Sequence, residues 1–157
     1  MRCTKKIVAT ADTVYADPSA LLKLYLHEPQ SRPMAAWRAK IKTPVLITHH
    51  GRVEMLNSIA LAAHRGIVTD AVCDAALAAL DDDFGQGRYV VADLQWRATL
   101  HTAADLSRQF TRKLGCRSLD ILHVAGALEL KCRSFLTFDV RQQQLARGVR
   151  LKLIIPT

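Results

Sequence analysis

Short apolar runs alternate along the chain with longer segments in which apolar residues recur every three to four positions. The short runs predict buried strands, and the longer periodic segments predict amphipathic helices. Strands are predicted at 13–17, 44–48, 89–92, 134–138 and 151–155, and helices at 19–28, 30–41, 49–65, 69–80, 95–114, from 118 and from 140. Strands that alternate with helices predict βαβ crossovers.

This alternation predicts one α/β domain, in which a mostly parallel sheet is covered by helices. The first predicted strand is weak, and residues 6–10 (KIVAT) compete with it. We therefore assign residues 1–12 to an N-terminal extension and residues 13–157 to the domain. A chain of 157 residues suits a single core that buries roughly two-thirds of the unfolded surface.

The composition is that of a globular protein, with 50% hydrophobic and 23% charged residues. The apolar runs are too short to span a bilayer and the first residues lack a signal-peptide core, so we expect a cytoplasmic protein with no membrane partner. The four cysteines are widely spaced and form no CxxC pair, which predicts reduced thiols. No HExxH motif is present, and the histidines predict no zinc site.

The net charge of +8 is unevenly distributed. Residues 1–96 contain 11 Lys and Arg against 10 Asp and Glu, whereas residues 97–157 contain 11 against 4. A basic half favours a polyanionic partner such as nucleic acid or an acidic protein segment. A solvated basic surface explains the same charge without any partner.

Four carboxylates are candidates for a functional site. Asp17 ends the first predicted strand, Asp139 follows the fourth, and Asp120 stands in the apolar run 119–130 near a helix start. Ligands of open α/β sheets bind beyond the carboxyl ends of the strands, where these aspartates are expected. Glu54 joins them from inside a predicted helix.

Each of these carboxylates also has a purely structural explanation. Asp17 and Asp139 stand where helix N-caps are expected, and Glu54 can be a solvated helix residue. Ser118 can cap the helix that places Asp120 in its first turn, where a negative charge suits the helix dipole. Capping does not explain why so basic a chain gathers acids at one edge of its sheet.

Converging carboxylates repel one another unless a cation lies among them. Mg²⁺ and Mn²⁺ prefer oxygen ligands and are typically held by one or two carboxylates together with substrate phosphate. Such an ion activates water and orients a phosphate for in-line attack. An acid cluster on a basic domain therefore suits cleavage of a nucleic-acid backbone.

Four motifs, in this order and spacing, resemble a known family: DPSALLKLYL, GRVEMLNSIA, SLDILHVAGALEL and FLTFDVRQ. The chain resembles PIN-domain proteins, and most closely the VapC ribonuclease toxins of type II toxin–antitoxin systems. The resemblance implies a PIN-like three-layer αβα sandwich around a mostly parallel five-stranded sheet. It assigns catalysis and metal binding to Asp17, Glu54, Asp120 and Asp139, and a supporting role to the hydroxyls of Ser19 and Thr137.

The resemblance also implies an activity and partners. We expect an endoribonuclease that depends on Mg²⁺ or Mn²⁺ and leaves 5′-phosphate and 3′-hydroxyl ends. It further implies a homodimer, and a cognate antitoxin that covers the active-site groove. The alternative is a catalytically silent PIN domain that binds RNA or a protein partner.

Three basic side chains near the motifs have open roles. His123 follows Asp120 by three residues, and the resemblance favours a buried, hydrogen-bonded histidine over a general acid. Arg52 and Arg117 can contact phosphate or pair with the acids of the site. The residues that bind RNA are not identified by any motif.

Overall fold

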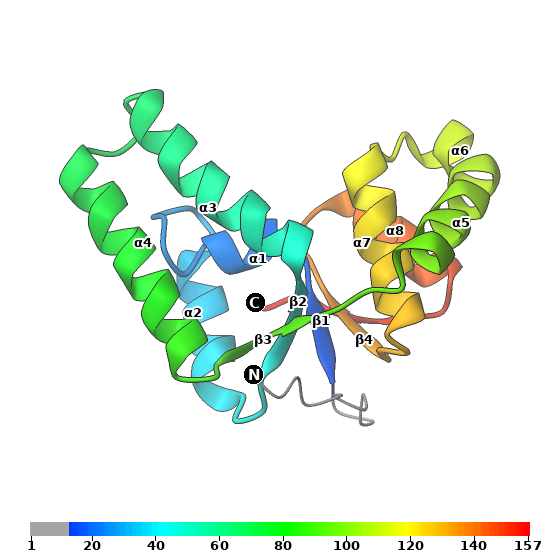
Figure 1. Ribbon diagram of the computed structural model, residues 1–157, viewed down its shortest axis with the longest axis horizontal. Coiled ribbons are helices and arrows are strands. Elements are labelled where there is room, and N and C mark those ends of the chain that lie inside the picture. The colour runs from blue at the N-terminus through cyan, green and yellow to red at the C-terminus, as the bar shows by residue number, and fades with distance from the viewer. Residues whose placement is uncertain (1–12) are drawn as a thin grey trace.

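The computed structural model describes residues 13–157, so the predicted extension 1–12 and the competing strand at 6–10 lie outside the described residues (Figure 1). Five strands form one sheet in the order β3-β2-β1-β4-β5, and every neighbouring pair is parallel. The strands are β1 (Val14–Ala16), β2 (Val45–Thr48), β3 (Tyr89–Ala92), β4 (Ser134–Leu136) and β5 (Lys152–Ile154). The predicted α/β class with a five-stranded parallel sheet is confirmed.

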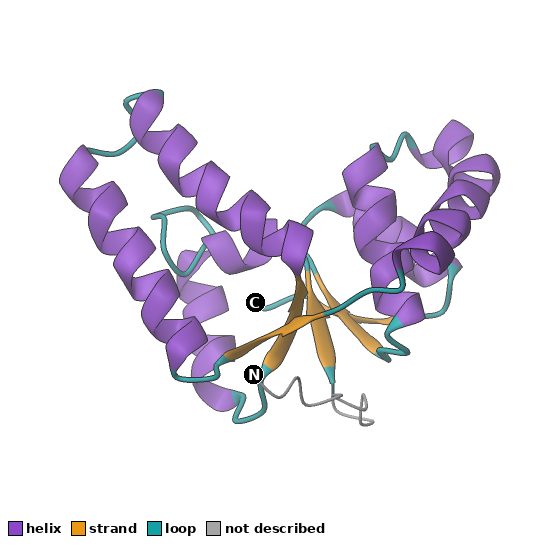
Figure 2. Cartoon of the chain, viewed as in Figure 1, coloured by secondary structure: helices purple, strands orange, loops and turns teal. Residues whose placement is uncertain are grey.

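Helices pack against both faces of the sheet. One face carries α1 (Pro18–Leu22), α2 (Ser31–Lys40), α3 (His49–His64) and α4 (Asp70–Gly85), and the other carries α5 (Trp96–Leu106), α7 (Ser118–Glu129) and α8 (Val140–Gly148). The helix α5 continues through a π-helical segment, η1 (Ser107–Thr111), into α6 (Arg112–Leu114). Figure 2 shows these two groups of helices on either side of the strands.

The strand β1 shows how the sheet separates two cores. Val14 and Ala16 belong to the cluster formed with α1 to α4, whereas Tyr15 between them belongs to the cluster formed with α5, α7 and α8. Successive side chains of a strand point to opposite faces, so both faces of a central strand are apolar when both are covered. Tyr15 stacks on Phe135 of β4, with ring centroids 5.6 Å apart. The three-layer sandwich is thereby confirmed.

Two helices end well away from their predicted last residues. The helix predicted at 19–28 ends at Leu22, because the chain turns there and brings the Tyr25 hydroxyl to Asp83 of α4. The helix predicted at 69–80 continues to Gly85, so the acidic run 81–83 lies inside α4 and does not close it. The chain turns after α4 at Gly87, whose φ of +70° is a conformation that favours glycine.

The helix predicted at 95–114 is continuous but contains η1. A π-helical turn inserts one extra residue into the helix, and no period in the sequence signals it. The ring of Phe110 in η1 lies against Gly148 of α8, where a Cβ atom would come within 2.7 Å of it. Glycine at position 148 therefore permits this contact between η1 and α8.

Cys73, Cys116 and Cys132 are free and buried, as predicted for reduced thiols. Among the helices of residues 13–157, none is both long enough and apolar enough to cross a membrane.

Candidate active site

The sheet brings the ends of β1 and β4 together. These neighbouring parallel strands pair Ala16 with Leu136, and the backbone N–H of Asp17 donates to the carbonyl of Leu136 at 2.9 Å. The residues that follow the two strands, Asp17 and Asp139, therefore lie at the same edge of the sheet. The packed helices α3 and α7 supply the other two candidate acids.

Asp17, Glu54, Asp120 and Asp139 line one cavity of about 200 Å³, which we call the acid pocket. The sequence predicted that these four carboxylates form one site, and the structure places all four around this one cavity. Its other lining residues include Ser19, Arg117, His123 and Gln142.

Asp17 is the most deeply buried of the four acids, with 4% of its surface exposed. It occupies the N-cap position of α1, but its side chain makes no capping hydrogen bond. Its carboxylate instead accepts from the hydroxyls of Ser19 and Thr137, the latter at 3.4 Å, so both predicted supporting residues contact it. The capping explanation of the Asp17 side chain is therefore wrong.

Burial raises the pKa of Asp17, and the nearby charge of Glu54 adds to this rise. His123 and the hydrogen bonds from Ser19 and Gln142 act in the opposite direction. Removal of a carboxylate from water disfavours its ionised form unless a positive charge is close. Among the described residues, no Lys or Arg forms an ion pair with Asp17.

Gln142 of α8 joins two of the acids, which the sequence did not predict. Its side-chain nitrogen donates to Oδ1 of Asp17 at 3.2 Å and to Oδ1 of Asp120 at 3.3 Å. The buried amide oxygen of Gln142 has no hydrogen-bond partner. The sequence offered only the three-residue spacing from Asp139, which suggests a capping partner and not a bridge between distant carboxylates.

Asp120 and Asp139 each combine a helix-terminal role with a place in the pocket. Oδ2 of Asp120 accepts from the backbone N–H of Arg117, which is the N-cap of α7 in place of the predicted Ser118. Oδ1 of Asp139 accepts from the backbone N–H groups of Arg141 and Gln142 in the first turn of α8. Asp120 and Asp139 therefore do interact with helix N-termini, as their structural explanation proposed. The other carboxylate oxygen of Asp120, Oδ1, accepts from Gln142.

Glu54 contacts the buried His123, whose Nε2 lies 2.5 Å from Glu54 Oε2. The Nδ1 atom of the same ring lies 2.8 Å from the hydroxyl of Tyr15. Burial raises the pKa of Tyr15, so this hydroxyl keeps its proton. His123 is thus the buried, hydrogen-bonded histidine that the sequence predicted.

His50 lies beside this group and was not recognised from the sequence. Its ring stacks on the ring of His123 with centroids 4.6 Å apart, and Trp96 meets it edge-on at 5.4 Å. Burial lowers the pKa of His50 to about 4, and the neighbouring His123 adds to this effect, so His50 is neutral near pH 7. The available signal was the four-residue spacing of His50 and Glu54 on one helix.

The two candidate arginines differ in position. Arg52 points away from the acids, since it pairs with Asp81 at 3.6 Å and lies over the ring of Phe84. Arg117 is exposed and lines the acid pocket.

The acid pocket suits a hard divalent cation. Its donors are carboxylate oxygens, the ligands that Mg²⁺ and Mn²⁺ prefer. A buried carboxylate without a paired Lys or Arg, as at Asp17, is the observation that a bound cation would explain. A second possible metal group, His50, Glu54 and His123, offers nitrogen as well as oxygen ligands.

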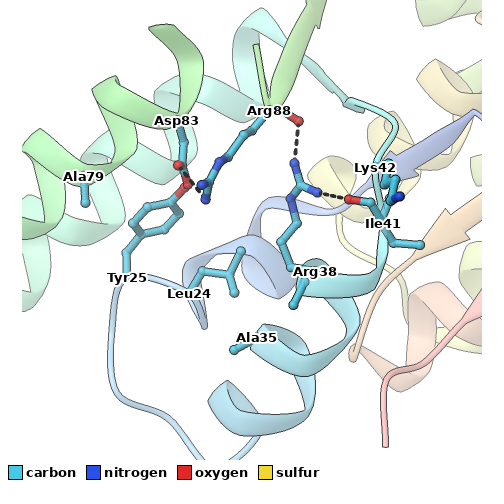
Figure 3. Close-up of a pocket in the computed structure, with 10 residues that line it drawn as sticks. Leu24, Tyr25, Ala35, Arg38, Ile41, Lys42, Ala79, Asp83 and Arg88 are labelled. Carbon is cyan, nitrogen blue, oxygen red and sulfur yellow. Dashed lines mark hydrogen bonds and ion pairs between the residues drawn. The ribbon is translucent and has the colours of Figure 1, made fainter. Parts of the chain in front are cut away.

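Another cavity, of about 660 Å³, opens near the amino ends of β2 and β3 and is shown in Figure 3. Asp83 there accepts from the Tyr25 hydroxyl at 2.5 Å and pairs with Arg88 at 3.2 Å. Arg38 donates to the backbone carbonyls of Ile41 and Arg88 and so ties together the segments that precede the two strands. In this cavity, which we call the strand-start pocket, Asp83 pairs with Arg88 and Arg38 is bound to backbone carbonyls.

Comparison with known proteins shows the fold. No protein-family model matches the chain, and no curated protein matches it. Among solved structures, the crystal structure of FitAcB from Neisseria gonorrhoeae matches with a TM-score of 0.61 and 14% sequence identity. The match covers 90% of this chain and 96% of that chain. The fold is therefore PIN-like over most of the domain.

Proposed function

We propose that this protein is a metal-dependent endoribonuclease and the VapC-like toxin of a toxin–antitoxin pair. One observation carries the proposal: Asp17, Glu54, Asp120 and Asp139 line a single cavity on a PIN-like fold. The sequence resemblance to VapC toxins assigns these same four residues to catalysis. The net charge of +8 supports an RNA substrate, because cationic side chains favour binding of the phosphate backbone.

The residues of the pocket have distinct roles in this proposal. Asp17 and Asp120 hold Mg²⁺ or Mn²⁺ centrally, and Glu54 and Asp139 complete the set of carboxylates. Ser19, Thr137 and Gln142 orient the first two acids through the hydrogen bonds described above. When bound, the ion would supply positive charge next to the scissile phosphate and would lower the pKa of a water molecule bound to it.

Arg117 is the basic side chain best placed to contact the RNA backbone. It is exposed, it lines the acid pocket, and its side chain forms no ion pair within residues 13–157. The expected antitoxin would cover this same opening, and the expected homodimer would leave it accessible. Both partners belong to the proposal.

Isothermal titration of Mn²⁺ into the antitoxin-free protein tests the metal site. We expect binding by the wild type and its loss in Asp120→Asn, while both proteins melt at similar temperatures. Since Asp120 is only partly buried, the substitution should not impair folding. Equal binding by wild type and variant would refute the assignment of the site.

Incubation with structured RNA and Mn²⁺ then tests the activity. Attack by water predicts products with 5′-phosphate and 3′-hydroxyl ends, whereas attack by the ribose 2′-hydroxyl would leave a cyclic phosphate. RNA binding without cleavage, by a protein that does bind Mn²⁺, would favour the catalytically silent module.

A further inference from the structure

The group formed by His50, Glu54 and His123 differs in chemistry from the acid pocket. One ligand atom of each residue lies within 4.8 Å of the other two. His50 and Glu54 are four residues apart on α3 and so share one helical face, while His123 comes from α7. We call these three residues the histidine group.

Two imidazoles and one carboxylate form a ligand set typical of transition metals. Imidazole nitrogen suits Zn²⁺, Co²⁺ and related ions, whereas Mg²⁺ and Mn²⁺ prefer oxygen alone. Two histidines and a glutamate are one of the three-ligand sets found in zinc sites that keep a fourth position open. The histidine group therefore selects a different ion from the acid pocket, although the two share Glu54.

Hydrogen bonds behind the group support this role. The Tyr15 hydroxyl lies 2.8 Å from Nδ1 of His123 and 3.4 Å from the Thr48 hydroxyl. A metal ion would displace the proton that lies between Nε2 of His123 and the Glu54 carboxylate, and Tyr15 would then accept from Nδ1–H of His123 and donate to Thr48. Partners of this kind fix the tautomer and orientation of metal-binding histidines.

His50 also has a nitrogen available for a metal. Its Nε2 atom lies 3.3 Å from the Thr48 hydroxyl, and its Nδ1 atom is buried without a hydrogen-bond partner. An unpaired buried polar atom is costly, and a metal ion would satisfy it. His50 is thus the member of the group with a ring nitrogen, Nδ1, that makes no hydrogen bond.

Binding requires the rings of His50 and His123 to leave their stacked arrangement, because an imidazole nitrogen binds a metal in the plane of its ring. Ligand atoms around a tetrahedral zinc ion lie about 3.4 Å apart. The contact of 2.5 Å between His123 and Glu54 must therefore widen, and the most distant pair of atoms must close from within 4.8 Å. His50 is only half-buried and can tilt from its stack on His123, which Tyr15 holds in place.

We propose that His50, Glu54 and His123 bind one transition-metal ion of the zinc class. Binding at this site does not depend on the nuclease function. Because Glu54 serves both sites, an ion held by the two histidines draws this carboxylate away from the acid pocket. Zn²⁺ then weakens the binding of Mn²⁺, and by linkage Mn²⁺ weakens the binding of Zn²⁺ equally.

Titration with Co²⁺ tests the proposal directly, because visible absorption distinguishes a four-coordinate ion with nitrogen ligands from an octahedral ion with oxygen ligands. Trp96 provides a second signal, since its ring lies 5.4 Å from His50 and the paramagnetic ion quenches its fluorescence. The Trp96→Phe variant identifies the share of emission that belongs to Trp37.

Three variants locate the ion. His50→Gln removes a ligand and should weaken Co²⁺ binding by more than the roughly tenfold seen when residues behind a ligand are lost. Asp17→Asn alters only the acid pocket and should keep the Co²⁺ absorption. His49→Gln is the matched control, because this exposed neighbour pairs with Asp93 outside the group.

Undiminished Co²⁺ binding by a folded His50→Gln variant would overturn the proposal. So would loss of the absorption in Asp17→Asn, which would place the ion in the acid pocket. Titration of Mn²⁺ with and without stoichiometric Zn²⁺ completes the test, and unchanged Mn²⁺ affinity would refute the sharing of Glu54. If Mn²⁺ does not bind at all, the proposed nuclease site fails while the Co²⁺ result still decides the histidine group.

Discussion

The acid pocket and the strand-start pocket both contain carboxylates, but they differ in how their most central carboxylates are held: Asp83 pairs with Arg88, whereas in the acid pocket it is Asp139, and not Asp17 or Asp120, that pairs with an arginine, Arg141 at 3.7 Å, in the part of the chain that the structure describes. Asp83 is satisfied by Arg88 and by the Tyr25 hydroxyl. Asp17 and Asp120 are held by neutral donors, and among the described residues no Lys or Arg pairs with either. Within residues 13–157, the central acids of the acid pocket thus lack a Lys or Arg partner, whereas Asp83 of the strand-start pocket has one.

The two pockets therefore contribute to different properties: the strand-start pocket to the stability of the fold, and the acid pocket to the proposed binding of a cation. Pairing within the chain stabilises a fold, because each buried polar group finds its partner on folding. Neutral donors position carboxylates without neutralising them, and this preserves their affinity for an external cation. Substitutions in the two pockets should therefore have opposite consequences.

Asp17→Asn should have the largest effect, and this effect should fall on activity. Loss of the central carboxylate is expected to lower RNA cleavage at least about a hundredfold, since the divalent ion loses a ligand. The thermal midpoint of the metal-free protein should stay the same or rise, because burial disfavours the ionised form of Asp17. Cleavage rates with Mn²⁺ and melting in chelator measure the two effects. Retained cleavage, or a large loss of stability, would contradict the comparison.

Gln142→Ala should weaken metal binding without removing a carboxylate. The substitution removes the one donor that Asp17 and Asp120 share, so we expect Mn²⁺ affinity to fall roughly 10-fold to 100-fold. Calorimetric titration measures the change. Gln143→Ala is the matched control, because its side chain contacts only the backbone carbonyl of Thr137. Equal affinities in the two variants would show that Gln142 does not position the acids.

Asp83→Ala should affect stability alone. It removes the ion-pair partner of Arg88 and one of the two partners of the Tyr25 hydroxyl, which still contacts the Tyr89 hydroxyl at 2.8 Å, and we expect the free energy of unfolding to fall by about 1–3 kcal/mol. Denaturant titration measures this loss, and the exposed neighbour Asp82 provides the control substitution. Mn²⁺ affinity at a temperature where the variant is folded should match the wild type. A change in that affinity would show that the two pockets are coupled.

Much of the fold could be predicted from local patterns. Each of the five strands was predicted from its apolar run, and the parallel sheet followed from the alternation of strands with helices. The gathering of Asp17 and Asp139 at one edge followed from the same logic, because each ends or follows a strand. The ends of α1 and α4 were not predicted from local patterns, and the contact near them between Tyr25 and Asp83 joins residues 58 positions apart.

The finer structure of the site depends on how α3, α7 and α8 meet. Helix α3 packs on one face of the sheet and α7 on the other, and they come together only beyond the strand ends. The stacking of His50 on His123 and the bridging position of Gln142 arise from that meeting. No spacing in the sequence encodes it, which is why the four acids were predicted but the residues that connect them were not.

Tyr89→Phe should have the smallest effect, which is on the pH dependence of stability, beside a pH-independent loss of the hydrogen bond from the Tyr25 hydroxyl. Burial raises the pKa of Tyr89 from 10.0 to about 12, so the folded protein keeps a proton that the unfolded chain releases above pH 10. The unfolded state then binds fewer protons, and wild-type stability falls between pH 10 and 12 by at most about 3 kcal/mol from this group. The variant lacks this phenol and should lose less stability over that interval. Denaturant titration at pH 9, 10 and 11 measures the difference, and parallel pH dependences of the two proteins would show that burial does not keep Tyr89 protonated in the folded state.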